Sequence, residues 1–121
     1  MLTDRMREAL RTAVKSRDKV AASALRSALA AIDNAGAIEL PAARRGLAIE
    51  ESPLGLGAAE AERRTLTEAD VARIVRAEIA DRDRAAAEYQ QAGHDERATR
   101  LLAEANVLRD LVASSREPDR G

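Results

Sequence analysis

Four segments of this chain repeat apolar residues at the spacing of an amphipathic α-helix, and none alternates apolar and polar residues as a strand does. This periodicity predicts an all-α fold without a β-sheet. The first and second segments are joined by a short connection, as are the third and fourth. We therefore expect a four-helix bundle of two antiparallel hairpins, with a long loop between helices two and three. The predicted helices span residues 4–16, 18–35, 67–92 and 95–113.

The core of such a bundle must be built almost entirely from aliphatic side chains. Hydrophobic residues make up 45% of the chain, but aromatic residues only 1%. Small side chains at helix contacts let helices approach closely, so a stable core does not require aromatic rings. The predicted core stripes contain Met6, Leu10 and Val14, then Val20, Leu25, Ala28, Leu29 and Ile32, then Val71, Ile74, Val75, Ile79, Ala86 and Tyr89, and finally Ala98, Leu101, Leu102, Ala105, Leu108 and Val112.

Residues typical of helix ends flank the first two segments. Thr3 is a candidate N-cap of the first helix, and Ser16 or Asp18 can cap the second. Short polar side chains favour these positions because they accept hydrogen bonds from the free N–H groups of a first turn. Gly36 follows the second segment, and glycine takes the left-handed conformation that often ends a helix. We expect the second helix to end just before it.

The third segment has the clearest start signal in the chain. Thr67 and Asp70 have the spacing of a capping box, in which each side chain bonds to the backbone N–H of the other residue. Leu66 and Val71 occupy the two positions of a hydrophobic staple, which fixes the direction from which the chain enters a helix. These signals predict a helix start at Thr67.

The only aromatic residue, Tyr89, and the only histidine, His94, lie in one stretch, EYQQAGHDERA at residues 88–98. We interpret it as the turn of the second hairpin, in which Gly93 ends the third helix and Asp95 caps the fourth. The ring of Tyr89 is predicted to cover the open end of the hairpin, and His94 to be exposed. Three consecutive ligand-type residues rarely converge on one metal, so we predict no metal site there.

The length of the chain fits one domain, which we place at residues 1–114. Within it, residues 37–65 are rich in proline and glycine, and we expect them to form a mobile loop. Residues 115–121 are predicted to be a disordered tail. The segment GLGAAE at residues 55–60 lacks the preceding strand and the third glycine of a dinucleotide-binding loop, so no cofactor is predicted.

Composition excludes several classes of site. The chain has no cysteine, which excludes disulfides, thiolate catalysis and Cys-ligated zinc, and one histidine cannot form a His-rich metal centre. No apolar run is long enough to span a membrane. Acidic residues in the first helix argue against a transit peptide, so we expect a cytoplasmic protein. The net charge of -1 excludes a global basic field, and any nucleic-acid contact must come from a local patch.

The best candidate for such a patch is the basic cluster Lys15, Arg17, Lys19 and Arg26 around the first interhelical turn. Its first three members are close enough in sequence to meet one phosphate backbone. No aromatic residue is interleaved with them, so the cluster offers no ring on which bases can stack. The alternative is a solvated basic turn without a ligand.

A second charged pair, Glu78 and Arg82, lies beside the apolar stripe of the third helix, one helical turn apart. The simplest interpretation is an intramolecular ion pair that fixes helix register. Such pairs often add little net stability, because desolvation opposes the attraction between the charges. The alternative is that the pair belongs to a groove that binds a partner.

Two parts of the sequence resemble the GatB/YqeY-like helical family. The likeness extends over most of residues 2–112 outside the loop, and it is a pattern of helices rather than a catalytic signature. The matching residues are RAEI at 76–79, EY at 88–89, AG at 92–93 and Glu104, together with Lys15, Asp18, Lys19 and Arg26 in the first hairpin.

The resemblance implies a helical domain of the family's N-terminal type. It also implies kinship with the tail of the B subunit of the glutamine-dependent aminoacyl-tRNA amidotransferase, where the tail engages tRNA and other domains perform the chemistry. The family-level activity is carbon–nitrogen ligation with glutamine as amide donor. We expect a stand-alone domain without catalysis of its own, associated with tRNA or with an amidotransferase. The alternative is a protein–protein interaction module with no RNA role.

Overall fold

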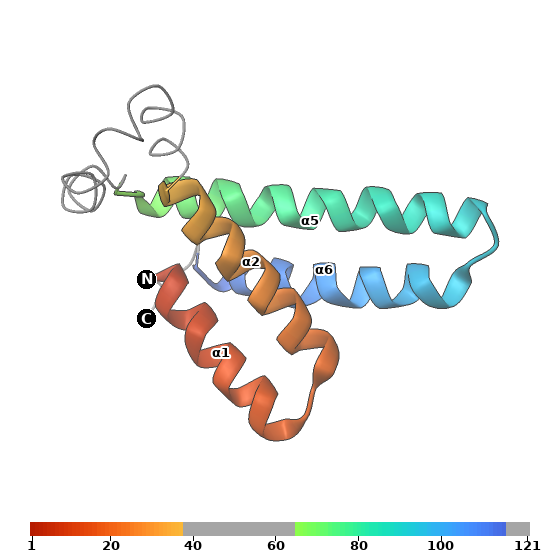
Figure 1. The fold of residues 1–121 in the computed structure, drawn as a ribbon, viewed down its shortest axis with the longest axis horizontal. Helices are drawn as coiled ribbons and strands as arrows, with labels where there is room; N and C mark the ends of the chain where they lie inside the picture. The colour runs from red at the N-terminus through yellow and green to blue at the C-terminus, as the bar shows by residue number, and fades with distance from the viewer. Residues whose placement is uncertain (38–64, 116–121) are drawn as a thin grey trace, which may run out of the picture.

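The computed structural model describes residues 1–37 and 65–115, and within these residues all regular structure is helical. The predicted all-α fold is therefore confirmed. Two antiparallel hairpins make up the bundle, and Figure 1 shows the shorter one inclined across one half of the longer one. The two interhelical turns point in different directions. The helices are α1 (Leu2–Ser16), α2 (Lys19–Ala37), α5 (Glu68–Gln91) and α6 (Asp95–Ser115).

The core lies where the two hairpins cross. Each of the four helices contributes at least one large side chain that is fully buried there. These side chains are Leu2, Met6, Leu25, Val75 and Leu108. Alanines fill the closer contacts, as the composition requires. The half of the α5–α6 hairpin beyond the crossing buries Ala86 and Ala98, which lie outside this main cluster.

The first helix begins earlier than predicted, at Leu2, and Thr3 is not its N-cap. Met1 occupies the cap position without a side-chain hydrogen bond. The backbone N–H of Leu2 instead donates to Oε2 of Glu68 across 2.6 Å. Burial of Leu2 explains the difference, because that side chain starts the apolar stripe one turn before Met6. The carboxylate from α5 then satisfies a free N–H group that a local cap would otherwise serve.

The second helix departs from the prediction at its end. Of the two predicted caps, Asp18 is the one used, since its Oδ1 accepts the N–H of Ala21 at 3.0 Å. Gly36 does not end the helix: it lies inside α2, which continues to Ala37, and it is buried. Its φ is not positive. A glycine at this position serves burial rather than a turn.

The starts of α5 and α6 can both be compared with the prediction. The capping box of α5 is confirmed, with the Asp70 N–H 3.0 Å from Thr67 Oγ1 and the Thr67 N–H 3.0 Å from Asp70 Oδ2. Asp95 is not the cap of α6, because the carbonyl of His94 already accepts the N–H of Ala98. Asp95 lies in the first turn of α6, where its charge still favours the helix dipole.

The predicted loop and tail fall mostly on residues 38–64 and 116–121, which lie outside the described residues. Their flanking residues Ala37 and Ser115 are the last residues of α2 and α6. Among the described helices, none has the length and apolar character needed to cross a bilayer.

Candidate nucleic-acid interface

The four cations of the predicted basic cluster are all exposed, three of them at the α1–α2 turn. Lys15 lies in the last turn of α1, Arg17 in the turn itself, and Lys19 at the first position of α2. Arg26 follows two helical turns later on α2. Within residues 1–37 and 65–115, no ion pair involves any of them, whereas most other arginines are paired with a carboxylate.

Three of the four cations border a surface hollow of about 460 Å³, and Lys15 does not. Its charged lining comes from Arg17, Asp18, Lys19 and Arg26, and its apolar lining from Ala13, Val14 and Ala22.

Val14 is the exception in the core prediction for α1. Its side chain is 49% exposed, although the helical spacing places it on the apolar stripe. Stripe position alone did not reveal this. Val14 lies in the last turn of α1, and Figure 1 shows this end of α1 directed away from α5 and α6. The result is an exposed aliphatic side chain in the hollow beside three cations.

The backbone of the α1–α2 turn is a Schellman motif, and an arginine occupies its left-handed position. The Asp18 N–H donates to the Ala13 carbonyl at 2.8 Å, and the Arg17 N–H to the Val14 carbonyl at 3.2 Å. Arg17 has φ 63°, the only positive φ of a non-glycine residue in the described part of the chain. A side chain in this conformation is sterically strained, by roughly 1–2 kcal/mol.

The α5–α6 turn has the same motif with a glycine at the equivalent position. The His94 N–H donates to the Tyr89 carbonyl at 2.8 Å, and the Gly93 N–H to the Gln90 carbonyl at 3.1 Å. Gly93 has φ 85°, as a turn glycine should. The exposed His94 ring meets Tyr89 edge-on at 5.9 Å, and the Arg97 guanidinium lies 5.6 Å from the Tyr89 ring centre. The contacts of the Tyr89 ring with His94 and Arg97 were not predicted.

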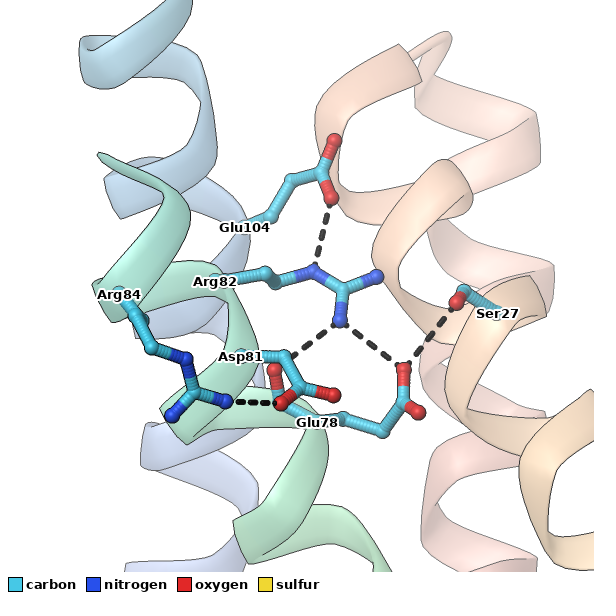
Figure 2. Close-up of polar contacts among 6 residues, drawn as sticks. All are labelled: Ser27, Glu78, Asp81, Arg82, Arg84 and Glu104. Carbon is cyan, nitrogen blue, oxygen red and sulfur yellow. Dashed lines mark hydrogen bonds and ion pairs between the residues drawn. The ribbon is translucent and has the colours of Figure 1, made fainter. Parts of the chain in front are cut away.

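Glu78 and Arg82 belong to a polar cluster between three helices (Figure 2). Arg82 Nη1 donates to Glu78 Oε1 at 3.0 Å, and Arg82 Nε donates to Glu104 Oε1 on α6 at 2.9 Å. The Ser27 hydroxyl on α2 donates to the same Glu78 oxygen at 3.2 Å. Glu104 is only 7% exposed, so a carboxylate is held inside the bundle.

The electrostatics of this cluster favour a permanently charged arginine. Burial acts to lower the pKa of the Arg82 guanidinium, but hydrogen bonds and charges from Glu104 and Glu78 outweigh it, so the pKa is raised. The cluster therefore joins α2, α5 and α6 through an arginine that stays charged. Sequence reasoning placed Glu78 with Arg82 but did not find Glu104 as the second partner.

A second hollow, of about 310 Å³, was also not predicted. It lies between α5 and α6 and is lined by Arg76, Ile79, Arg109, Val112 and Ala113. Arg109 is held there by Asp83, with Nη2 3.1 Å from Oδ1. No three potential ligands among the described histidines and carboxylates are grouped so that they could hold a metal ion.

Comparisons with protein-family models, with curated proteins and with solved structures give no match for this chain. The likeness to the GatB/YqeY-like family therefore rests on the sequence patterns described above.

Proposed function

We propose that this chain is a non-catalytic helical domain that binds RNA, with tRNA as the expected class, through the α1–α2 turn. The proposal includes association with a tRNA-dependent amidotransferase, the glutamine-dependent carbon–nitrogen ligase to which the family resemblance points. The observation that carries it is a group of exposed cations around one hollow, namely Arg17, Lys19 and Arg26. None of the three forms an ion pair with another described residue.

Free cations matter because RNA binding releases counterions from phosphates. A lysine or arginine already paired with a neighbouring carboxylate contributes less to this release than one in water. Arg7, Arg84 and Arg109 are paired in this way with Asp4, Asp81 and Asp83. The α1–α2 turn is thus a local positive region on a chain whose net charge is -1.

Asp18 does not remove this positive character. Its Oδ1 accepts the Ala21 N–H at the start of α2, so its negative charge is placed against the positive end of the helix dipole. The neighbouring cations Arg17 and Lys19 form no ion pair with it.

The alternative function is a protein-interaction module without an RNA role. The observation that favours it is the apolar part of the same hollow, where Val14 is 49% exposed. An acidic amphipathic helix would satisfy both the cations and the apolar lining, as helix-in-groove recognition requires.

A salt titration of tRNA binding distinguishes the two functions. RNA binding through this turn predicts affinity that falls steeply with salt, with a logarithmic slope of roughly 2–4 for three or four neutralised phosphates. The interaction module predicts no tRNA affinity even at low salt. Retrieval of partners from native lysate with and without ribonuclease provides the second readout, because only RNA-mediated retrieval is lost on digestion.

A further inference from the structure

The two interhelical turns of this molecule form an internal comparison. Both are Schellman motifs with the same two backbone hydrogen bonds, but the left-handed residue is Gly93 in one and Arg17 in the other. A glycine would relieve the strain at Arg17. Strained residues of this kind concentrate at sites where the side chain has a function. Here the arginine lines the hollow, and no described group pairs with it.

We propose that this hollow holds one unpaired nucleotide of a bound RNA. The base lies against Val14 and the guanidinium plane of Arg17, and the phosphates on either side of it meet Lys19 and Arg26. This inference rests on the proposed RNA-binding function and specifies which part of an RNA the site takes.

The lining of the hollow favours an unpaired nucleotide over a paired one. The backbone of a duplex presents charged phosphates and sugars, which would leave the apolar surface of Ala13, Val14 and Ala22 unused. An unpaired base presents a flat, weakly polar face that can leave water for this surface. Guanidinium planes also stack on bases, so Arg17 offers a face that a lysine would not.

The size and the charge of the hollow fit the same occupant. Its volume of about 460 Å³ lies within the range of pockets that hold small organic ligands. The charged lining is three cations and Asp18, whose Oδ1 accepts the Ala21 N–H, so the lining keeps a net positive charge that complements a base with a phosphate on either side. An acidic peptide has some of the same chemistry, and its binding in place of RNA is an outcome of the test below.

The test uses a short RNA duplex and the same duplex with a one-nucleotide bulge, with the full-length protein. The wild type is expected to bind the bulged RNA at least about fivefold more tightly, the lower end of what one stacked base contributes. Val14→Ser and Arg17→Lys should each remove most of this preference, because the first removes the apolar surface under the base and the second removes the guanidinium plane.

A matched control is Val20→Ser, a half-buried valine of α2 that does not line the hollow. It should keep the preference for the bulged RNA. Circular dichroism confirms that each variant is folded.

Three results would overturn the inference. If the wild type binds both RNAs equally, the hollow does not select an unpaired nucleotide, although RNA binding itself stands. If it prefers the bulge and both Val14→Ser and Arg17→Lys keep that preference, the nucleotide binds elsewhere. If no RNA is bound and an acidic peptide is, the proposed function fails together with the inference.

Discussion

Arg82 Nε donates to Glu104 Oε1 across 2.9 Å and so joins α5 to α6 at positions 22 residues apart in the sequence. The same guanidinium donates a hydrogen bond to Glu78. The Glu78 carboxylate also accepts a hydrogen bond from the hydroxyl of Ser27 on α2. Arg82 therefore joins α5 to α6, and Glu78 connects this pair to α2 of the other hairpin, as Figure 2 shows.

Replacing Arg82 should be among the most damaging single changes outside the aliphatic core. Arg82→Met leaves Glu104, which is 7% exposed, without its main partner. Breaking a buried pair from one side typically lowers the free energy of unfolding by about 3–5 kcal/mol. Because Glu104 can also reach Arg100 at 3.7 Å, we expect the lower end of this range, as measured by urea unfolding.

The double variant Arg82→Met with Glu104→Leu is the control for this prediction. It removes the stranded carboxylate and should recover a large part of the lost stability. A loss below about 1 kcal/mol in the single variant would show that water or Arg100 serves Glu104 equally well.

The left-handed position of the α1–α2 turn should be more stable with glycine than with arginine. Arg17→Gly relieves steric strain but increases the freedom of the unfolded chain, so the net gain in unfolding free energy should be roughly 0.5–1 kcal/mol. Gly93→Ala is the reciprocal change. No atom lies within 4 Å of an added Cβ at residue 93, so its loss of about 1 kcal/mol would be purely conformational.

Thermal and urea unfolding measure both changes. Arg17→Gly should also weaken RNA binding while it stabilises the fold, a combination that a purely structural arginine would not produce. Destabilisation by Arg17→Gly would contradict our account of this turn.

The capping box of α5 should contribute measurably to stability. Thr67→Ala removes the side chain that accepts the Asp70 N–H and should lower the free energy of unfolding by about 1 kcal/mol. Thr99→Ala, at an exposed position inside α6, is the matched control and should stay within about 0.5 kcal/mol of the wild type. Equal effects of the two changes would mean that α5 starts without help from this cap.

Local signals explain what the sequence predicted well. The helical stripes and the Thr67–Asp70 spacing depend on residues within one or two turns, and the helices and capping box formed as expected. Two predictions failed or stayed incomplete because a distant residue intervened. Glu68 replaced Thr3 in serving the start of α1, and Glu104 joined Arg82 from another helix. Neither partner can be identified before the hairpins are packed together.

The residues of the candidate site show the same division. The basic cluster could be found because its members are close in sequence, and the structure places three of them around one hollow. The exposure of Val14 and the left-handed backbone of Arg17 could not be found in this way. The exposure of Val14 depends on how the two hairpins pack, and an arginine carries no sequence signal for a conformation that glycine prefers.

The central claim is that the α1–α2 turn binds RNA, and a triple charge reversal tests it directly. Changing Lys15, Arg17 and Lys19 to Glu should abolish tRNA binding under conditions where the wild type binds. Any residual binding should have a salt slope lower by roughly 2–3 units, at about 0.9 per lost phosphate contact. The helices should remain folded, because all three side chains are exposed.

The measurement is the tRNA dissociation constant at several salt concentrations, for the wild type, this variant and a control of equal charge. The control changes Arg7, Arg84 and Arg100 to Glu, three exposed arginines that are paired with carboxylates away from the turn. Our account predicts that the control keeps the wild-type salt slope and the turn variant loses it. Equal slopes in all three proteins, or no tRNA binding by the wild type at low salt, would contradict the account.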